Sequence, residues 1–84
     1  MAYDAQLHIL RSAARAISAN DTRAGHYAET ARSNLSAALQ QCDSKAARRW
    51  IVALRMALHV GPLDEQLRDP AVIALAEIET DIAE

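Results

Sequence analysis

Apolar residues recur at alternating spacings of three and four along four stretches of the chain, with polar residues between them. This spacing places the apolar side chains of each stretch on one face of an α-helix, which has about 3.6 residues per turn. The four sets are Tyr3, Leu7, Leu10, Ala14 and Ile17; Ala24, Ala28, Ala31, Leu35, Ala38 and Cys42; Ala47, Ile51, Leu54 and Leu58; and Ala71, Leu75, Ile78 and Ile82. The pattern predicts helices over about residues 3–19, 22–41, 44–60 and 70–83.

Short polar side chains separate the first three predicted helices. Asn20 and Asp21 interrupt the first apolar stripe, because such side chains compete for backbone hydrogen bonds. We expect Asp21 or Thr22 to cap the second helix, and Asp43 or Ser44 to cap the third.

Glycine and proline separate the third and fourth predicted helices. Gly61 is suited to a left-handed conformation after the third helix, and Pro62 cannot continue that helix. Residues 62–68 are expected to form a short helical turn. Asp69 as the N-cap and Pro70 at the first helical position then predict the start of the last helix.

These short connections predict one domain over residues 1–84, an all-α antiparallel bundle of four helices. Cys42 closes the second apolar stripe and is expected to be a small core residue. As the single cysteine, it excludes an intramolecular disulfide and a cysteine-rich zinc site. No apolar run is long enough for a membrane span and no signal peptide is recognisable, so we expect a cytoplasmic protein. The richness in alanine and arginine is typical of a bacterial or phage-encoded protein.

Charge divides the chain unevenly. Residues 1–63 hold eight basic and four acidic side chains, whereas residues 64–84 hold one basic and seven acidic ones. The predicted third helix is basic and the fourth is acidic. Either the two helices pair within the bundle, or they form a binding surface with two signs of charge.

The third predicted helix holds the candidate partner-binding residues. Trp and Arg dominate the energetics of many protein interfaces, and here they are adjacent. Trp50 also adjoins the core stripe, so a position at the edge of the core is its alternative role. The main prediction is a non-enzymatic module that binds a larger protein partner, as an adaptor, inhibitor or regulator. The residues proposed to bind are Lys45, Arg48, Arg49, Trp50 and Arg55. Self-association as a homodimer is a further alternative, because alanine-rich stripes make a thin core.

A segment at the start of the third predicted helix resembles the turn and recognition helix of helix-turn-helix proteins. Cys42, Asp43, Ala47, Arg49 and Trp50 occupy the matching positions. The resemblance implies a DNA-binding transcriptional regulator, in which arginine reads base edges. The net charge of −2 does not favour nucleic acid as the partner, so this is the alternative function.

A segment of the first predicted helix resembles the phosphorylated segment of histidine-phosphotransfer bundles. His8, Leu10, Arg11, Ser12 and Ala13 occupy the matching positions. The resemblance implies a third function, phosphotransfer through His8.

Enzymatic and cofactor chemistry has little support in the sequence. With two glycines in the chain, no glycine-rich phosphate loop exists. His26 and His59 have no acidic partner at a helical ligand spacing that would compose a metal site. We therefore predict no catalytic residues, no metal and no cofactor.

Overall fold

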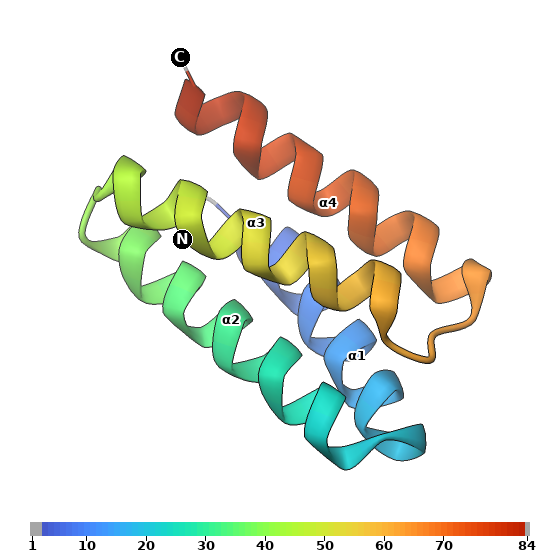
Figure 1. Ribbon diagram of the computed structural model, residues 1–84. Coiled ribbons are helices and arrows are strands. Elements are labelled where there is room, and N and C mark those ends of the chain that lie inside the picture. The colour runs from blue at the N-terminus through green and yellow to red at the C-terminus, as the bar shows by residue number, and fades with distance from the viewer. Residues whose placement is uncertain (1–2, 84) are drawn as a thin grey trace.

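The computed structural model describes residues 3–83, which form four helices: α1 (Asp4–Asn20), α2 (Thr22–Gln40), α3 (Ser44–Val60) and α4 (Glu65–Ala83). Successive helices run antiparallel, and α4 packs against α1 as well as α3 (Figure 1). The helices therefore surround one core, and no described residue forms a strand. The predicted all-α bundle is confirmed. None of the described helices combines the length and apolar composition that crossing a membrane requires.

The core is built from the apolar stripes that the spacing predicts. Its largest fully buried side chains are Leu10, Ile17, Leu35, Ile51, Leu54, Leu58, Leu75 and Ile78. All are aliphatic, and alanines fill the space between them, which lets the helix backbones approach closely. The Cα radius of gyration of 11.6 Å is close to the value of about 12 Å expected for a compact domain of this length.

Aspartates cap α2 and α3. An Asp21 carboxylate oxygen accepts a hydrogen bond from the backbone N–H of Ala24 at 3.1 Å. Asp43 accepts one from Ala46, also at 3.1 Å. Each bond satisfies a donor that the first turn of a helix leaves unpaired. Of the two residues predicted as possible caps for each of these helices, the aspartate is therefore the one that caps.

The last helix begins earlier than predicted. It starts at Glu65, so the prediction of Asp69 as N-cap and Pro70 as first helical residue is wrong. Pro70 lies inside α4 instead. The Asp64 carboxylate accepts a hydrogen bond from the N–H of Gln66 at 3.0 Å and stabilises the first turn. Proline has no backbone N–H, so α4 loses a single backbone hydrogen bond near its start. The helix tolerates this loss because it already has a turn before Pro70.

Cys42 is exposed, which contradicts its predicted place in the core. The hydrogen-bonded turns of α2 end at Gln40, and Cys42 lies in the following turn with a left-handed φ of 55°. Its N–H bonds to the carbonyl of Leu39, which tightens the end of the helix. The apolar stripe of α2 therefore ends at Ala38.

Gly61 is extended, with φ −69° and ψ 153°, so the predicted left-handed conformation is wrong. A Cβ atom at this position would lie 2.8 Å from the carbonyl oxygen of Ala57 and 3.1 Å from Ile17 Cδ1. Glycine is therefore favoured because a side chain at this position would come too close to Ala57 and Ile17. Its backbone φ does not require glycine.

Candidate protein interface

The residues predicted to bind a partner occupy different environments on α3. Lys45, Arg48 and Arg49 are exposed in its first half. Trp50 is half-buried and packs against the core, which agrees with a position at the bundle edge. The structure thus presents three cations to solvent and uses the indole partly for packing.

Arg55 lies on the side of α3 that faces α4. Its Nη2 donates to Glu79 Oε1 at 2.7 Å, and both side chains remain partly exposed. The basic and acidic helices are neighbours, and this pair joins them as the intramolecular interpretation of the charge pattern predicts. A partly exposed ion pair contributes on the order of 1 kcal/mol or less, so it orients the helices more than it stabilises them.

Three large apolar side chains project from the outside of α3. Val52, Met56 and Val60 follow one another at a spacing of four and are 57%, 59% and 79% exposed. Four residues correspond to about one helical turn, so they form a row along the helix. Sequence reasoning missed this row, although its spacing could have revealed a second apolar stripe opposite the core.

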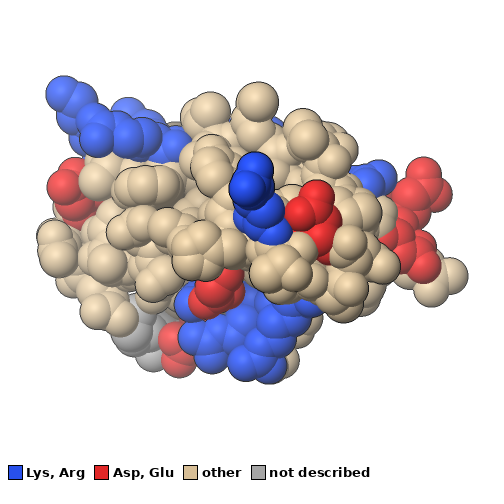
Figure 2. Space-filling model, turned by 60° about the horizontal axis from the view of Figure 1, so that its bottom comes forward, with Lys and Arg blue, Asp and Glu red and all other residues tan. Residues whose placement is uncertain are grey.

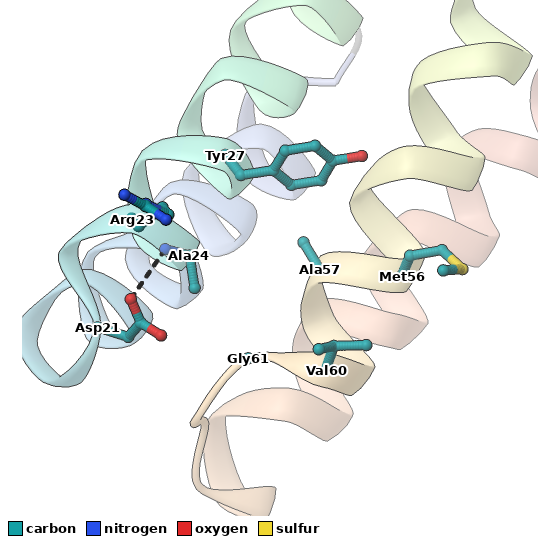
Figure 3. Close-up of a pocket in the computed structure, with 8 residues that line it drawn as sticks. All are labelled: Asp21, Arg23, Ala24, Tyr27, Met56, Ala57, Val60 and Gly61. Carbon is teal, nitrogen blue, oxygen red and sulfur yellow. Dashed lines mark hydrogen bonds between the residues drawn. The ribbon is translucent and has the colours of Figure 1, made fainter.

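A groove runs beside this row, between α2 and α3. It has a volume of about 350 Å³ and is lined by Asp21, Arg23, Ala24, Tyr27, Met56, Ala57, Val60 and Gly61. Figure 3 shows the Tyr27 ring extending from α2 towards α3, with Met56 and Val60 on the opposite side. Met56 and Val60 belong to the row and also line the groove, so the groove and the row form one apolar surface. Tyr27, which is 53% exposed, is part of this surface. We call this surface, consisting of Tyr27, Val52, Met56 and Val60, the apolar patch.

Basic side chains lie at both ends of the apolar patch. Arg23 lines the groove on α2, and Lys45, Arg48 and Arg49 precede the row on α3. Asp21 is the one carboxylate among the residues that line the groove, and it caps α2. The surface therefore offers apolar contact area bordered mainly by positive charge.

No protein-family model, curated protein or solved structure matches the chain, so the chemistry of the surface itself carries the functional argument. Among residues 3–83, no group of three or more His, Cys, Asp and Glu side chains is placed to hold a metal ion.

The arrangement of α2 and α3 differs from a helix-turn-helix unit. In that motif the two helices cross at about 90–120°. Here α2 and α3 run antiparallel side by side (Figure 1). Arg49 is exposed, as a residue that reads base edges must be. The helix that carries it, however, packs side by side with α2 and does not cross it as a recognition helix would.

The three histidines lie apart on the surface. His8 is exposed on α1, His26 is exposed on α2, and His59 is exposed in the last turn of α3. His8 borders a hollow that Arg11 and Arg32 also line. This hollow lies between α1 and α2.

Arg32 is the buried charged residue of the described chain, and sequence reasoning did not single it out. Its Nε lies 3.1 Å from both carboxylate oxygens of Glu29, and its Nη2 lies 2.7 Å from Oε1. This planar, forked contact pairs the buried guanidinium with a half-exposed carboxylate one turn earlier. The hydrogen bond from Arg32 lowers the pKa of Glu29, and the charges of Arg32, Arg11 and Arg15 lower it further against the opposing effect of burial.

The ion pair between Arg32 and Glu29 is expected to stabilise the fold by an amount that depends on pH. A carboxylate whose pKa is lowered by folding stabilises the protein above its unfolded pKa, and the contribution is lost as pH falls through the folded pKa. We expect Glu29→Gln to be less stable than the wild type at pH 7, and the difference to shrink as pH falls below about 4.5, the ordinary pKa of the group. Urea unfolding of both proteins across this range measures the effect. A difference that stays constant with pH would show that the Glu29 charge does not stabilise the fold.

Proposed function

We propose that the protein is a non-enzymatic interaction module that binds a protein partner through the apolar patch and the neighbouring cations of α3. The row of Val52, Met56 and Val60 carries this proposal, because three large apolar side chains on consecutive turns gain free energy when a partner covers them. Within the proposal the module is a cytoplasmic adaptor, inhibitor or regulator of bacterial or phage origin.

The chemistry of the surface favours an amphipathic, acidic helix as the bound segment. Such a helix would place its apolar side chains on the patch, with one of them entering the groove against Tyr27. Its acidic side chains would face Lys45, Arg48 and Arg49. Charge complementarity of this kind increases the association rate and fixes the orientation of the partner.

The apolar patch also favours a protein partner over DNA. Contacts to the phosphate backbone use Lys, Arg and polar donors, and they leave no role for a row of exposed valine and methionine. The antiparallel packing of α2 and α3 also favours a protein partner, because the two helices of a helix-turn-helix unit cross at about 90–120°. Phosphotransfer through His8 has no comparable support beyond the exposure of the imidazole.

Replacing Met56 and Val60 together by glutamate tests the apolar contribution. We expect at least a tenfold loss of affinity for a partner isolated with the wild type from a nuclease-treated host lysate, because two charges would enter the apolar contact. The matched control is Ile73→Glu, since Ile73 is 61% exposed on α4, away from the patch. The control should bind as the wild type does, and thermal melting should show that both variants fold.

Charge reversal of Arg48 and Arg49 tests the electrostatic contribution. We expect the double glutamate variant to bind the same partner more slowly, with a smaller dependence on salt than the wild type shows. Unchanged affinity in this variant and in the Met56 and Val60 variant would contradict the proposed surface. Recovery of nucleic acid, with proteins lost after nuclease treatment, would support the DNA-binding alternative instead.

A further inference from the structure

A second basic surface lies between α1 and α2, away from the apolar patch. Figure 2 shows a dense group of Lys and Arg side chains at the lower edge of the molecule, with acidic side chains beside it. Arg11 and Arg15 lie one turn apart on α1, and Arg32 follows on α2. Two adjoining hollows are located here, and Arg11 lines both.

The larger hollow has a volume of about 580 Å³ and mixed polar and apolar walls. It is lined by Arg11, Ala14, Arg15, Ser18, Thr22, Gly25, His26 and Glu29. Its buried lining residues, Ala14 and Gly25, are small, and its other lining side chains include guanidinium, imidazole and hydroxyl groups. The volume is within the range of about 300–1,000 Å³ that is usual for sites of small ligands.

The charges around the larger hollow do not balance. Among the described residues that line it, Glu29 is the one carboxylate, and its two oxygens are bound by Arg32. Asp4 belongs to the smaller hollow and does not line the larger one. Arg11 and Arg15 are therefore two cations of the same hollow without a matching second carboxylate there. Like charges at a spacing of four destabilise a helix by about 0.2–0.5 kcal/mol, and a bound anion would reverse this effect.

We propose that the hollow between α1 and α2 binds a small phosphate-bearing compound, with Arg11 and Arg15 as the cations that hold the phosphate. A phosphate monoester carries a charge of about −1.5 to −2 near pH 7, which matches two guanidinium groups. The planar fork of arginine donors fits phosphate oxygens, and the hydroxyls of Ser18 and Thr22 supply neutral donors on the same rim.

The lining also indicates which part of the compound is recognised. No Phe, Tyr or Trp lines the hollow, so it offers no platform on which a nucleobase could stack. Hydroxyl groups and an imidazole can instead bond to the hydroxyls of a sugar or polyol. A sugar phosphate therefore fits the site better than a nucleotide.

Titration calorimetry with pyrophosphate, glucose 6-phosphate and AMP tests this proposal, at constant ionic strength maintained with sodium chloride. We expect saturable binding to the wild type, glucose 6-phosphate binding at least as tightly as AMP, and at least a tenfold weakening in Arg11→Gln/Arg15→Gln. The control Arg48→Gln/Arg49→Gln removes two exposed arginines from α3 and should bind these compounds as the wild type does. The Glu29→Gln variant should bind more tightly, because it removes a negative charge from the rim.

Amide chemical shifts locate the bound compound independently of affinity. Shifts that are confined to residues lining the hollow, such as Arg15, Ser18, Thr22 and Gly25, would place it there. Absence of saturable binding, or equal weakening in the α1 and α3 variants, would overturn the proposal and show that any effect is general charge screening. Tighter binding of AMP than of glucose 6-phosphate would overturn the inference about the sugar.

Discussion

Replacing Gly25 by alanine should lower the melting temperature by about 10 °C, although alanine is the better helix former. Gly25 is buried in α2 where that helix crosses α1. An added Cβ would overlap the Cα and Cβ of Ser18 and lie 2.6 Å from its backbone nitrogen. Backbone atoms cannot rotate away, so the two helices must separate. We estimate a cost of about 3 kcal/mol, reduced by about 1 kcal/mol through helix propensity. In a domain of this size, 1 kcal/mol corresponds to about 4–8 °C.

Thermal and urea unfolding measure this effect. The control is Ser33→Ala in the same helix, at an exposed position where the change should lie within about 0.5 kcal/mol of zero. Adding Ser18→Gly to the alanine variant should restore little stability, because the Cα and nitrogen of residue 18 remain in place. A Gly25→Ala protein as stable as the wild type would mean that α1 and α2 do not approach closely at Gly25 and Ser18 in solution.

Replacing Arg68 by methionine should destabilise the protein by about 2 kcal/mol. Arg68 lies in the first turn of α4, and its Nε donates to the carbonyl oxygen of Leu58 at 2.9 Å. Its Nη2 donates to Leu63 at 2.8 Å and more weakly to Gly61 at 3.5 Å. The guanidinium thereby satisfies carbonyl groups at the end of α3 and in the connection to α4. Bonds to a charged donor contribute about 1.5–3 kcal/mol when buried, and partial exposure of this group reduces their sum.

Urea unfolding with an unchanged slope should show this loss as a lower midpoint. Arg68→Lys should recover only part of the stability, because an ammonium group lacks the fork that reaches several carbonyls. The exposed control Arg48→Met should change the stability little. If Arg68→Met were as stable as this control, the guanidinium would not hold the connection in solution.

Helical periodicity was sufficient to predict the core, because apolar residues that recur with the helical period lie on one face of the helix and that face is the one that is buried. Leu35 on α2 and Ile51 on α3 are fully buried, as their stripes require. The errors arose where a single local signal competed with others. Pro70 indicated a helix start, but the cap at Asp64 begins the helix a turn earlier. Cys42 was in phase with its stripe, but the hydrogen-bonded turn ends first.

The candidate interface was predictable only in part. The exposure of Arg48 and Arg49 follows from the helical phase of α3. The groove does not, because it depends on the register between two helices, which brings Tyr27 of α2 opposite Met56 of α3. The burial of Arg32 could not be predicted either, since it depends on how closely α1 approaches α2. Tertiary packing decides both the groove and the burial of Arg32, and spacing within one helix does not encode it.

Photo-crosslinking from position 56 tests the central claim most directly. A photoreactive amino acid replaces Met56 on α3, or Ile73 on α4 as the control, in the cells that naturally produce the protein. Both side chains are about equally exposed, at 59% and 61%. We predict a discrete crosslinked product with one protein from position 56, attached within an acidic amphipathic helix, and none from position 73. Products of equal yield from both positions, or crosslinks to nucleic acid alone, would contradict the proposed interface.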